Sequence, residues 1–146
     1  MVDLVDDDPD AVGVMLNYFY SFQMSHFPDQ TYEEARTLEC KVYAIADKYG
    51  CSELKELAKD IFAIETFWFM ASSDALPAEV VQQVYASTPE TDRGLRDVCC
   101  GIYFRLKTSI ETQSEEDRQE SLSKFEKLVQ AVPAYAVDIA MYELRK

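Results

Sequence analysis

Residues that break helices are scarce in this chain. Its 146 residues include only four glycines and five prolines, too few for the many turns of a sheet-rich fold. Apolar residues recur with the period of an α-helix through most of the chain. The sequence therefore predicts an all-α fold. We expect a stack of about seven helices, with at most one short strand at Val2–Val5.

Local signals place the ends of the predicted helices. Asp8 can cap a first helix that we expect to end near Phe22, and Thr31 with Glu34 forms a capping box for a second helix. Gly50 follows this helix, where a left-handed residue is favoured. The remaining helices are expected from Ser52, from about Pro77, around the stripe Leu95–Leu106, from Ser114, and around Tyr135–Tyr142. The first helix is expected to bury Val12, Met15, Leu16 and Phe19.

The charge balance limits the classes of partner. Fourteen basic and 27 acidic residues leave a formal charge of −13, which repels phosphate, so we expect neither nucleic acid nor an anionic membrane as a partner. The acidic start MVDLVDDD does not resemble a signal peptide. The four cysteines, Cys40, Cys51, Cys99 and Cys100, form no C-x-x-C pair. Reduced thiols fit an intracellular protein of the cytoplasm or nucleus.

The acidic run near the start was considered as a calcium loop. If Asp6, Asp8 and Asp10 held the first three ligand positions, Ala11 would stand where glycine is needed and Asn17 where the bidentate glutamate belongs. The run is interpreted instead as a charged helix start.

The sequence offers little material for catalysis. His26 is the single histidine, so a two-histidine zinc site is ruled out, and only Cys40 or Cys51 could join it in a nucleophile pair. We interpret His26 as a polar loop residue. The four glycines, at positions 13, 50, 94 and 101, form no phosphate-binding loop. We expect no catalytic residue, metal or cofactor, and keep a small enzyme as the less favoured alternative.

Aromatic residues are crowded in two segments, NYFYSF (17–22) and TFWFM (66–70). Successive residues of a helix lie about 100° apart, so one buried face does not hold all of these rings. Either both sides of these helices are covered, or some rings await a partner. The candidate partner contacts are Phe22, Met24, Phe27, Trp68 and Phe69.

Two longer motifs resemble a known family. DDDPDAVGVMLNYFY (6–20) followed by CKVYAIADKYGCSELKELAKDIF (40–62) is similar to the C-terminal half of a fungal BTB/POZ domain, and VYASTPETDRGLRD (84–97) resembles the segment that these fungal proteins carry after that domain. The resemblance implies that residues 1–70 are the C-terminal helical part of a BTB/POZ-like domain and that residues 71–146 are a helical extension packed on it.

The resemblance also implies a function. We expect a non-enzymatic protein–protein interaction module that docks through aromatic and Met side chains, or alternatively a substrate adaptor of a cullin ubiquitin ligase. The sequence SFQMSHF (21–27) stands where the family has a Thr-Gly-Asp-Tyr-like turn, in a region that helps some BTB proteins bind a cullin. The resemblance also implies that the chain starts after the strands and two helices that build much of the family's homodimer interface, either as a fragment or as a naturally short form. We therefore expect either self-association or a replacement packing by Val2–Val5 and the seventh helix.

Overall fold

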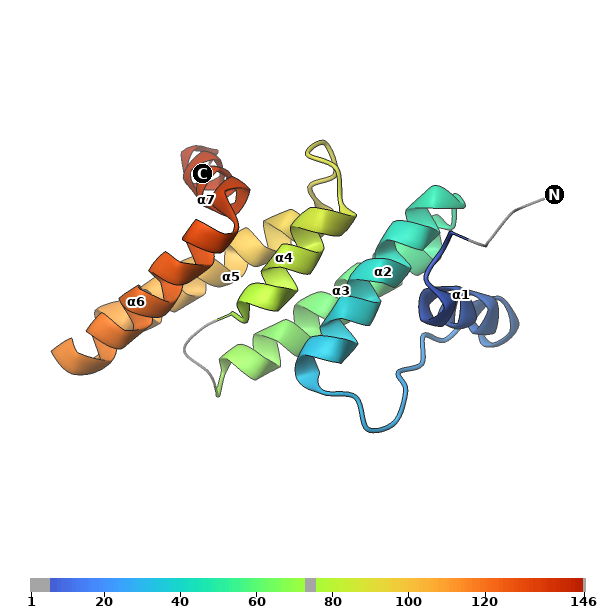
Figure 1. The fold of residues 1–146 in the computed structure, drawn as a ribbon, viewed down its shortest axis with the longest axis horizontal. Helices are drawn as coiled ribbons and strands as arrows, with labels where there is room; N and C mark the ends of the chain where they lie inside the picture. The colour runs from blue at the N-terminus through green and yellow to red at the C-terminus, as the bar shows by residue number, and fades with distance from the viewer. Residues whose placement is uncertain (1–5, 73–75, 146) are drawn as a thin grey trace. The chain divides into compact units, whose positions relative to one another are not determined.

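The computed structural model describes residues 6–72 and 76–145, and within these ranges the chain forms seven α-helices and no strand (Figure 1). The predicted all-α class is confirmed, whereas the predicted strand at Val2–Val5 lies outside the described residues. The helices are α1 (Pro9–Ser21), α2 (Tyr32–Lys48), α3 (Ser52–Met70), α4 (Ala78–Ser87), α5 (Gly94–Glu111), α6 (Glu115–Ala131) and α7 (Pro133–Leu144).

The chain divides into two compact units, Met1–Ile64 and Glu65–Lys146. The division falls inside α3, a few residues before the boundary at residue 70 that the resemblance implies. That boundary and its assignment to a BTB/POZ-like part and an extension stay predictions.

The predicted helix starts of the first unit are confirmed in atomic detail. The carboxylate of Asp8 accepts hydrogen bonds from the backbone amides of Asp10 and Ala11, each at 3.1 Å. At the start of α2 the Thr31 hydroxyl accepts from the Glu34 amide at 3.2 Å, and the Glu34 carboxylate accepts from the Thr31 amide at 2.9 Å. Both arrangements satisfy amides that have no partner within the helix.

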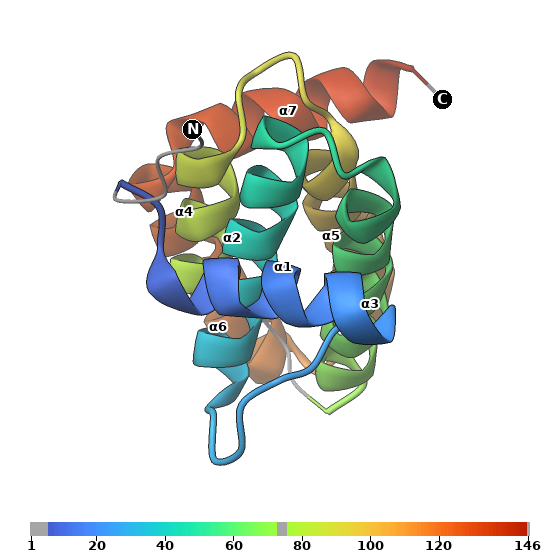
Figure 2. The same cartoon turned by 90° about the vertical axis from the view of Figure 1, so that its right-hand side faces the viewer.

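The buried face of α1 differs from the prediction. The helix buries Ala11, Val14, Met15 and Tyr18, whereas Leu16 and Phe19 are exposed. Both sets fit the helical period because α1 is apolar around most of its circumference, so periodicity alone does not select a face. The face is selected by α2, across which α1 lies (Figure 2).

The core of the first unit draws on all three of its helices. Ala46 of α2 and Ala58 of α3 are completely buried. The larger buried apolar residues of these two helices are Leu38, Val42, Tyr43, Ile45, Leu54 and Phe62.

The second unit packs α4, α5, α6 and α7 together (Figure 1). On α4, Val80, Val81 and Val84 are completely buried. On α7 the hydroxyl of buried Tyr135 donates to the backbone carbonyl of Cys99 at 2.9 Å. This buried hydroxyl therefore has its hydrogen-bond partner on α5. Ser114 caps α6 as predicted, its hydroxyl accepting from the Asp117 amide.

Two glycines allow a matched test of the backbone. Gly50 ends α2 with φ of 70°, and a Cβ there meets no atom within 4 Å. Gly50→Ala should therefore lower the free energy of unfolding by about 1 kcal/mol through backbone strain alone. Gly13 lies inside α1 with equal room, so Gly13→Ala should raise it by about 0.5–1 kcal/mol. Urea unfolding measures both, and shifts of equal sign would contradict this account.

The cap of α1 should also respond to pH. Lys41 lies 2.7 Å from the Asp8 carboxylate, and this ion pair, helped by the two backbone amides, lowers the pKa of Asp8. A lowered carboxyl pKa stabilises the fold above the unfolded value of 3.8, and this contribution is lost as the pH falls through the folded value. Asp8→Asn keeps a capping oxygen without the charge. Its unfolding free energy should fall less steeply below about pH 4 than that of the parent chain, and an equally steep fall would refute the assignment.

Candidate functional site

The five candidate contact residues divide between the two units. Phe22, Met24 and Phe27 lie in the first unit, at the end of α1 and in the loop that leads to α2; Phe22 is 73% exposed, Phe27 is exposed and Met24 is half-buried. Trp68 and Phe69 lie in the last turns of α3, in the second unit, with Trp68 66% exposed and Phe69 half-buried. Within the first unit the structure brings three candidates onto one short segment.

Phe22 has an unfavourable backbone conformation. It is the residue that ends α1, with φ of 55° and ψ of 25°, and its amide donates to the Tyr18 carbonyl at 2.7 Å. This left-handed conformation costs a side-chain-bearing residue roughly 1–2 kcal/mol, so glycine or asparagine is the usual choice. The Phe22 ring makes an edge contact with the Tyr18 ring, at 6.0 Å between centroids. A strained and exposed aromatic residue is a reason to look for function at that position.

More exposed apolar residues lie beside Phe22 on α1. Leu16, Phe19 and Tyr20 share one helix face by their spacing, and Tyr20 is 89% exposed. The Tyr18 ring lies 6.3 Å from the Phe19 ring and 6.0 Å from the Phe22 ring, so Phe22 belongs to the same patch. We call Leu16, Phe19, Tyr20 and Phe22 the α1 surface.

Most of the α1 surface is not predicted from the sequence, because the helical period there leads us to expect Leu16 and Phe19 to be buried. A signal was present in the charge pattern. Residues 11–28 contain no Asp, Glu, Lys or Arg, although the chain as a whole carries 41 such residues, 14 basic and 27 acidic. A long uncharged segment in such a highly charged chain indicates a surface that a binding partner covers.

The loop after Phe22 is fixed to α2 by a buried charge cluster. His26 Nε2 and Arg36 Nη2 each lie 2.6 Å from the same oxygen of Glu39, a residue with no exposed surface. Burial raises the pKa of Glu39, while Arg36 and His26 act in the opposite direction. His26 lies in a loop, as expected, but its contact with a buried carboxylate was not predicted. The contact holds the loop that carries Met24 and Phe27.

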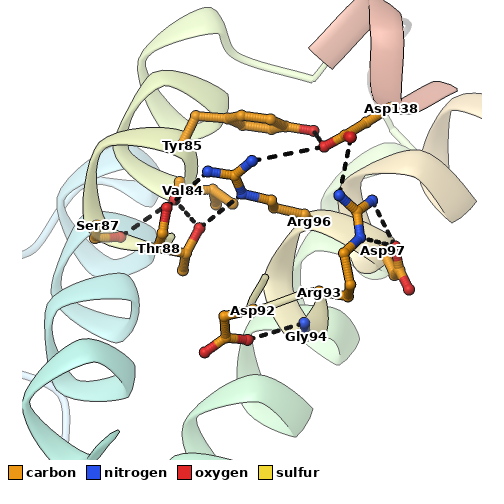
Figure 3. Close-up of polar contacts among 10 residues, drawn as sticks. All are labelled: Val84, Tyr85, Ser87, Thr88, Asp92, Arg93, Gly94, Arg96, Asp97 and Asp138. Carbon is orange, nitrogen blue, oxygen red and sulfur yellow. Dashed lines mark hydrogen bonds and ion pairs between the residues drawn. The ribbon is translucent and has the colours of Figure 1, made fainter. Parts of the chain in front are cut away.

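The densest polar cluster of the second unit is centred on Arg96 of α5 (Figure 3). Its guanidinium donates to the Thr88 carbonyl at 2.7 Å and to the Thr88 hydroxyl at 3.1 Å, at the end of α4. It also lies 4.4 Å from the centroid of the Tyr85 ring. This buried cation is therefore satisfied by groups of α4 that the helix leaves free at its last turn.

Asp138 of α7 completes this cluster. Its carboxylate accepts from the Tyr85 hydroxyl at 2.6 Å and lies 2.8 Å from Arg93 and 3.9 Å from Arg96 (Figure 3). Burial, and then the hydrogen bond to Asp138, raise the pKa of Tyr85 well above its ordinary value. Arg93 also pairs with Asp97 at 2.8 Å. The cluster joins α4, α5 and α7, and its charged groups pair with one another between these helices.

Two of the four cysteines, Cys99 and Cys100, are buried as free thiols in α5. Burial raises the pKa of Cys99 far above its ordinary value and that of Cys100 to about 11, so these thiols stay protonated near neutral pH. In the described parts of the chain, no group of three or more His, Cys, Asp or Glu residues is placed to hold a metal ion. None of the helices in residues 6–72 and 76–145 is both long and apolar enough to cross a membrane.

Comparison of the chain with protein-family models, with curated protein sequences and with solved structures gave no match. The BTB/POZ resemblance accordingly stays a prediction from the sequence motifs.

Removing Asp138 should cost much more stability than removing a neighbouring carboxylate. Asp138→Ala leaves the Tyr85 hydroxyl without its acceptor and removes the carboxylate that faces Arg93 and buried Arg96, and we expect a loss of about 3 kcal/mol in the free energy of unfolding. Asp97→Ala removes a carboxylate from the same Arg93 at a more exposed position and should cost less than about 1 kcal/mol. Chemical denaturation compares the two, and equal losses would show that Asp138 is not the centre of the cluster.

Proposed function

We propose that this chain is a non-enzymatic protein-interaction module of BTB/POZ type that binds a partner protein through the α1 surface and the loop after it. The partner's groove would receive Phe22 together with Tyr20 and Phe27. The acidic surroundings of this uncharged patch would set its specificity at the rim.

The observation that carries the proposal is the state of Phe22. Its ring is 73% exposed, although its backbone is in a conformation that disfavours a bulky residue. Stability alone would favour glycine or asparagine at this position. A partner that buries the ring would give a reason for phenylalanine, because aromatic anchors supply much of the energy of protein interfaces.

The anchoring of the loop supports the same proposal. His26 is tied to buried Glu39, and the Ser25 hydroxyl lies 3.3 Å from the side-chain amide nitrogen of Asn17 on α1. A segment that is held in place before binding loses less conformational entropy when a partner covers it. Phe27 and Met24 are therefore presented from a fixed backbone.

Trp68 is the second candidate anchor. It is exposed on α3, and its ring meets the Phe67 ring edge to face at 5.9 Å. Phe67 in turn carries the guanidinium of Arg105 4.3 Å from its ring centroid. In the second unit, the Trp68 ring therefore packs against the Phe67 ring, which in turn contacts Arg105. Trp68 and Phe69 stay in the proposal as contacts that are independent of the α1 surface.

The cullin-adaptor alternative stays a prediction that no described contact favours. The loop at residues 21–27 is the region that bears on it, because the family's usual turn is replaced there. The experiment below distinguishes the two cases, since it identifies the partner by mass.

Phe22→Asn separates binding from stability. Asparagine tolerates the left-handed conformation, so the unfolding midpoint should stay equal or rise. Contacts with the partner should weaken by about tenfold or more, as for loss of an interface anchor. The binding measurement places a photo-crosslinking residue at Tyr20 of the full chain in living cells, with Leu144, which is also highly exposed, as the matched control position.

We expect discrete crosslinked products from position 20, none from position 144, and loss of the products with Phe22→Asn. Mass spectrometry identifies the product as a second copy, a cullin or another protein. If no product forms at position 20, or if the products persist with Phe22→Asn, the α1 surface is not the binding site.

A further inference from the structure

We propose that one exposed face of α7 binds the same face of a second copy of this chain, with the two α7 helices antiparallel. Six exposed residues form this face, which we call the α7 face: Pro133, Ala134, Val137, Ala140, Met141 and Leu144. The opposite side of α7 is buried at Tyr135 and Ile139, and Asp138 points into the Arg96 cluster (Figure 3). The α7 face is part of the second unit, so the proposal is independent of the α1 surface.

The α7 face is apolar although it meets solvent. Val137 is 62% exposed and Leu144 is 80% exposed, and none of the six residues is charged in a chain with 41 charged residues, 14 basic and 27 acidic. The exposed side of α6 differs, because it carries charged residues at helical spacing, namely Glu116, Glu120 and Lys124. A helix face that meets only water usually carries polar residues, so we expect a partner to cover the α7 face.

Four residues of the α7 face follow the spacing of a coiled-coil seam. Pro133, Val137, Ala140 and Leu144 are separated by four, three and four positions. This alternation keeps one stripe of a helix directed at a second helix along its whole length. The buried side of α7 already packs on α5 and α6, so the seam is left for a helix from outside the unit.

The sizes of these side chains select a second copy that runs in the opposite direction. An interface between two identical faces must be complementary to itself. When the two-fold axis lies close to position 138, an antiparallel pair brings a large side chain against a small one at each level: Leu144 against Pro133, Met141 against Ala134, and Val137 against Ala140. A parallel pair would place Leu144 against Leu144 and Ala140 against Ala140, so the helices would not keep the even separation of close packing.

The charged residues at the end of α7 fit the same arrangement. Glu143 lies in the last turn, where the dipole of its own helix disfavours an acid, and it is 3.6 Å from Lys107, farther than a hydrogen bond. In the antiparallel pair Glu143 comes near the first turn of the other α7, which has no acidic residue and no side-chain cap. Arg145 comes near the end of the other α6, whose last turn has no basic residue. Each helix end then gains the charge that its dipole favours.

The small area of the α7 face limits the affinity of this dimer. A helix of 12 residues buries less than the roughly 1,200 Å² of a standard interface, so we expect a dissociation constant of about 100 μM. A chain present at about 1 μM in cells is then almost entirely monomeric, so position 144 remains a control for crosslinking from Tyr20. The dimer is measured at about 0.15 M salt, which screens the repulsion between two acidic chains.

Sedimentation equilibrium of the full chain between about 10 μM and 1 mM measures this association, and the average mass should rise from monomer toward dimer. Val137→Lys places a charge at the centre of the face in each copy and should weaken association by at least about tenfold. Tyr20→Lys makes the same charge change at a highly exposed ring on the α1 surface and should change it by less than about twofold. Both positions are exposed, so the unfolding midpoints in urea should stay close to that of the parent chain.

Disulfide formation tests the direction of the helices. Single Ala134→Cys and Met141→Cys chains are made with Cys51→Ser, since the other three cysteines are buried, and an equal mixture is oxidised under mild conditions. We expect the mixed 134–141 disulfide to dominate, because an antiparallel pair brings these two positions together. It leaves two copies of one position about 10 Å apart along the helix, beyond the reach of a disulfide. A parallel pair would give the 134–134 and 141–141 products.

Glu143→Gln tests the contacts with the helix ends. It should weaken association by about threefold, because both copies lose a favourable contact with a helix N-terminus. If Glu143 only added to the repulsion between two acidic chains, the same variant would strengthen association. Glu116→Gln, at the exposed start of α6, is the control that we expect to strengthen it slightly, because it only lowers the negative charge.

The proposal is overturned if the parent chain is monomeric at about 1 mM, if Val137→Lys and Tyr20→Lys have the same effect, if the 134–134 and 141–141 disulfides form as readily as the mixed one, or if Glu143→Gln strengthens association. Loss of association with Tyr20→Lys alone would also overturn it, because the dimer would then lie at the α1 surface. Association that is lost only with Val137→Lys, together with the mixed disulfide, would establish the α7 face as the contact, whatever the α1 surface binds.

Discussion

The need to pair buried cations organises both units of this protein. A guanidinium without solvent is costly unless a carboxylate or several acceptors surround it. In the first unit, buried Arg36 is matched by Glu39 one turn along the same helix, and the carboxylate then also holds His26. In the second unit, buried Arg96 donates to Thr88 at the end of α4, and Asp138 of α7 supplies a carboxylate 3.9 Å away. The same carboxylate pairs with Arg93 of α5 and Tyr85 of α4, so this cluster connects three helices.

The two left-handed residues that end α1 and α2 show different uses of the same geometry. At Gly50 the conformation has no steric cost and turns the chain toward α3. At Phe22 the same conformation carries a large exposed ring. The first choice favours folding, whereas the second sacrifices some stability at a surface position. The strained backbone of Phe22, in addition to its exposure, is therefore the reason to regard it as a functional residue.

The α1 surface and the polar clusters differ in their physical chemistry. The α1 surface is aromatic and lies in a segment without charged residues, which suits insertion into a groove of another protein. The clusters around Glu39 and Arg96 are buried, and their charged groups pair with one another.

The sequence by itself determined the features that depend on residues within a turn or two of one another. The all-α class, the caps at Asp8, Thr31 and Ser114, and the glycine that ends α2 were all predictable, because their hydrogen bonds are made locally. The candidate contacts at Phe22 and its neighbours could be named from aromatic crowding, but not their exposure.

Tertiary packing decided the rest. Because α1 is apolar around most of its circumference, only its packing against α2 selected which residues were buried and left Phe19 exposed. The contact of Tyr85 with Asp138 spans 53 positions, and no local pattern encodes a partner so distant. Short-range hydrogen bonds can be predicted from spacing, whereas burial of a face and pairing of distant charges arise only when the helices meet.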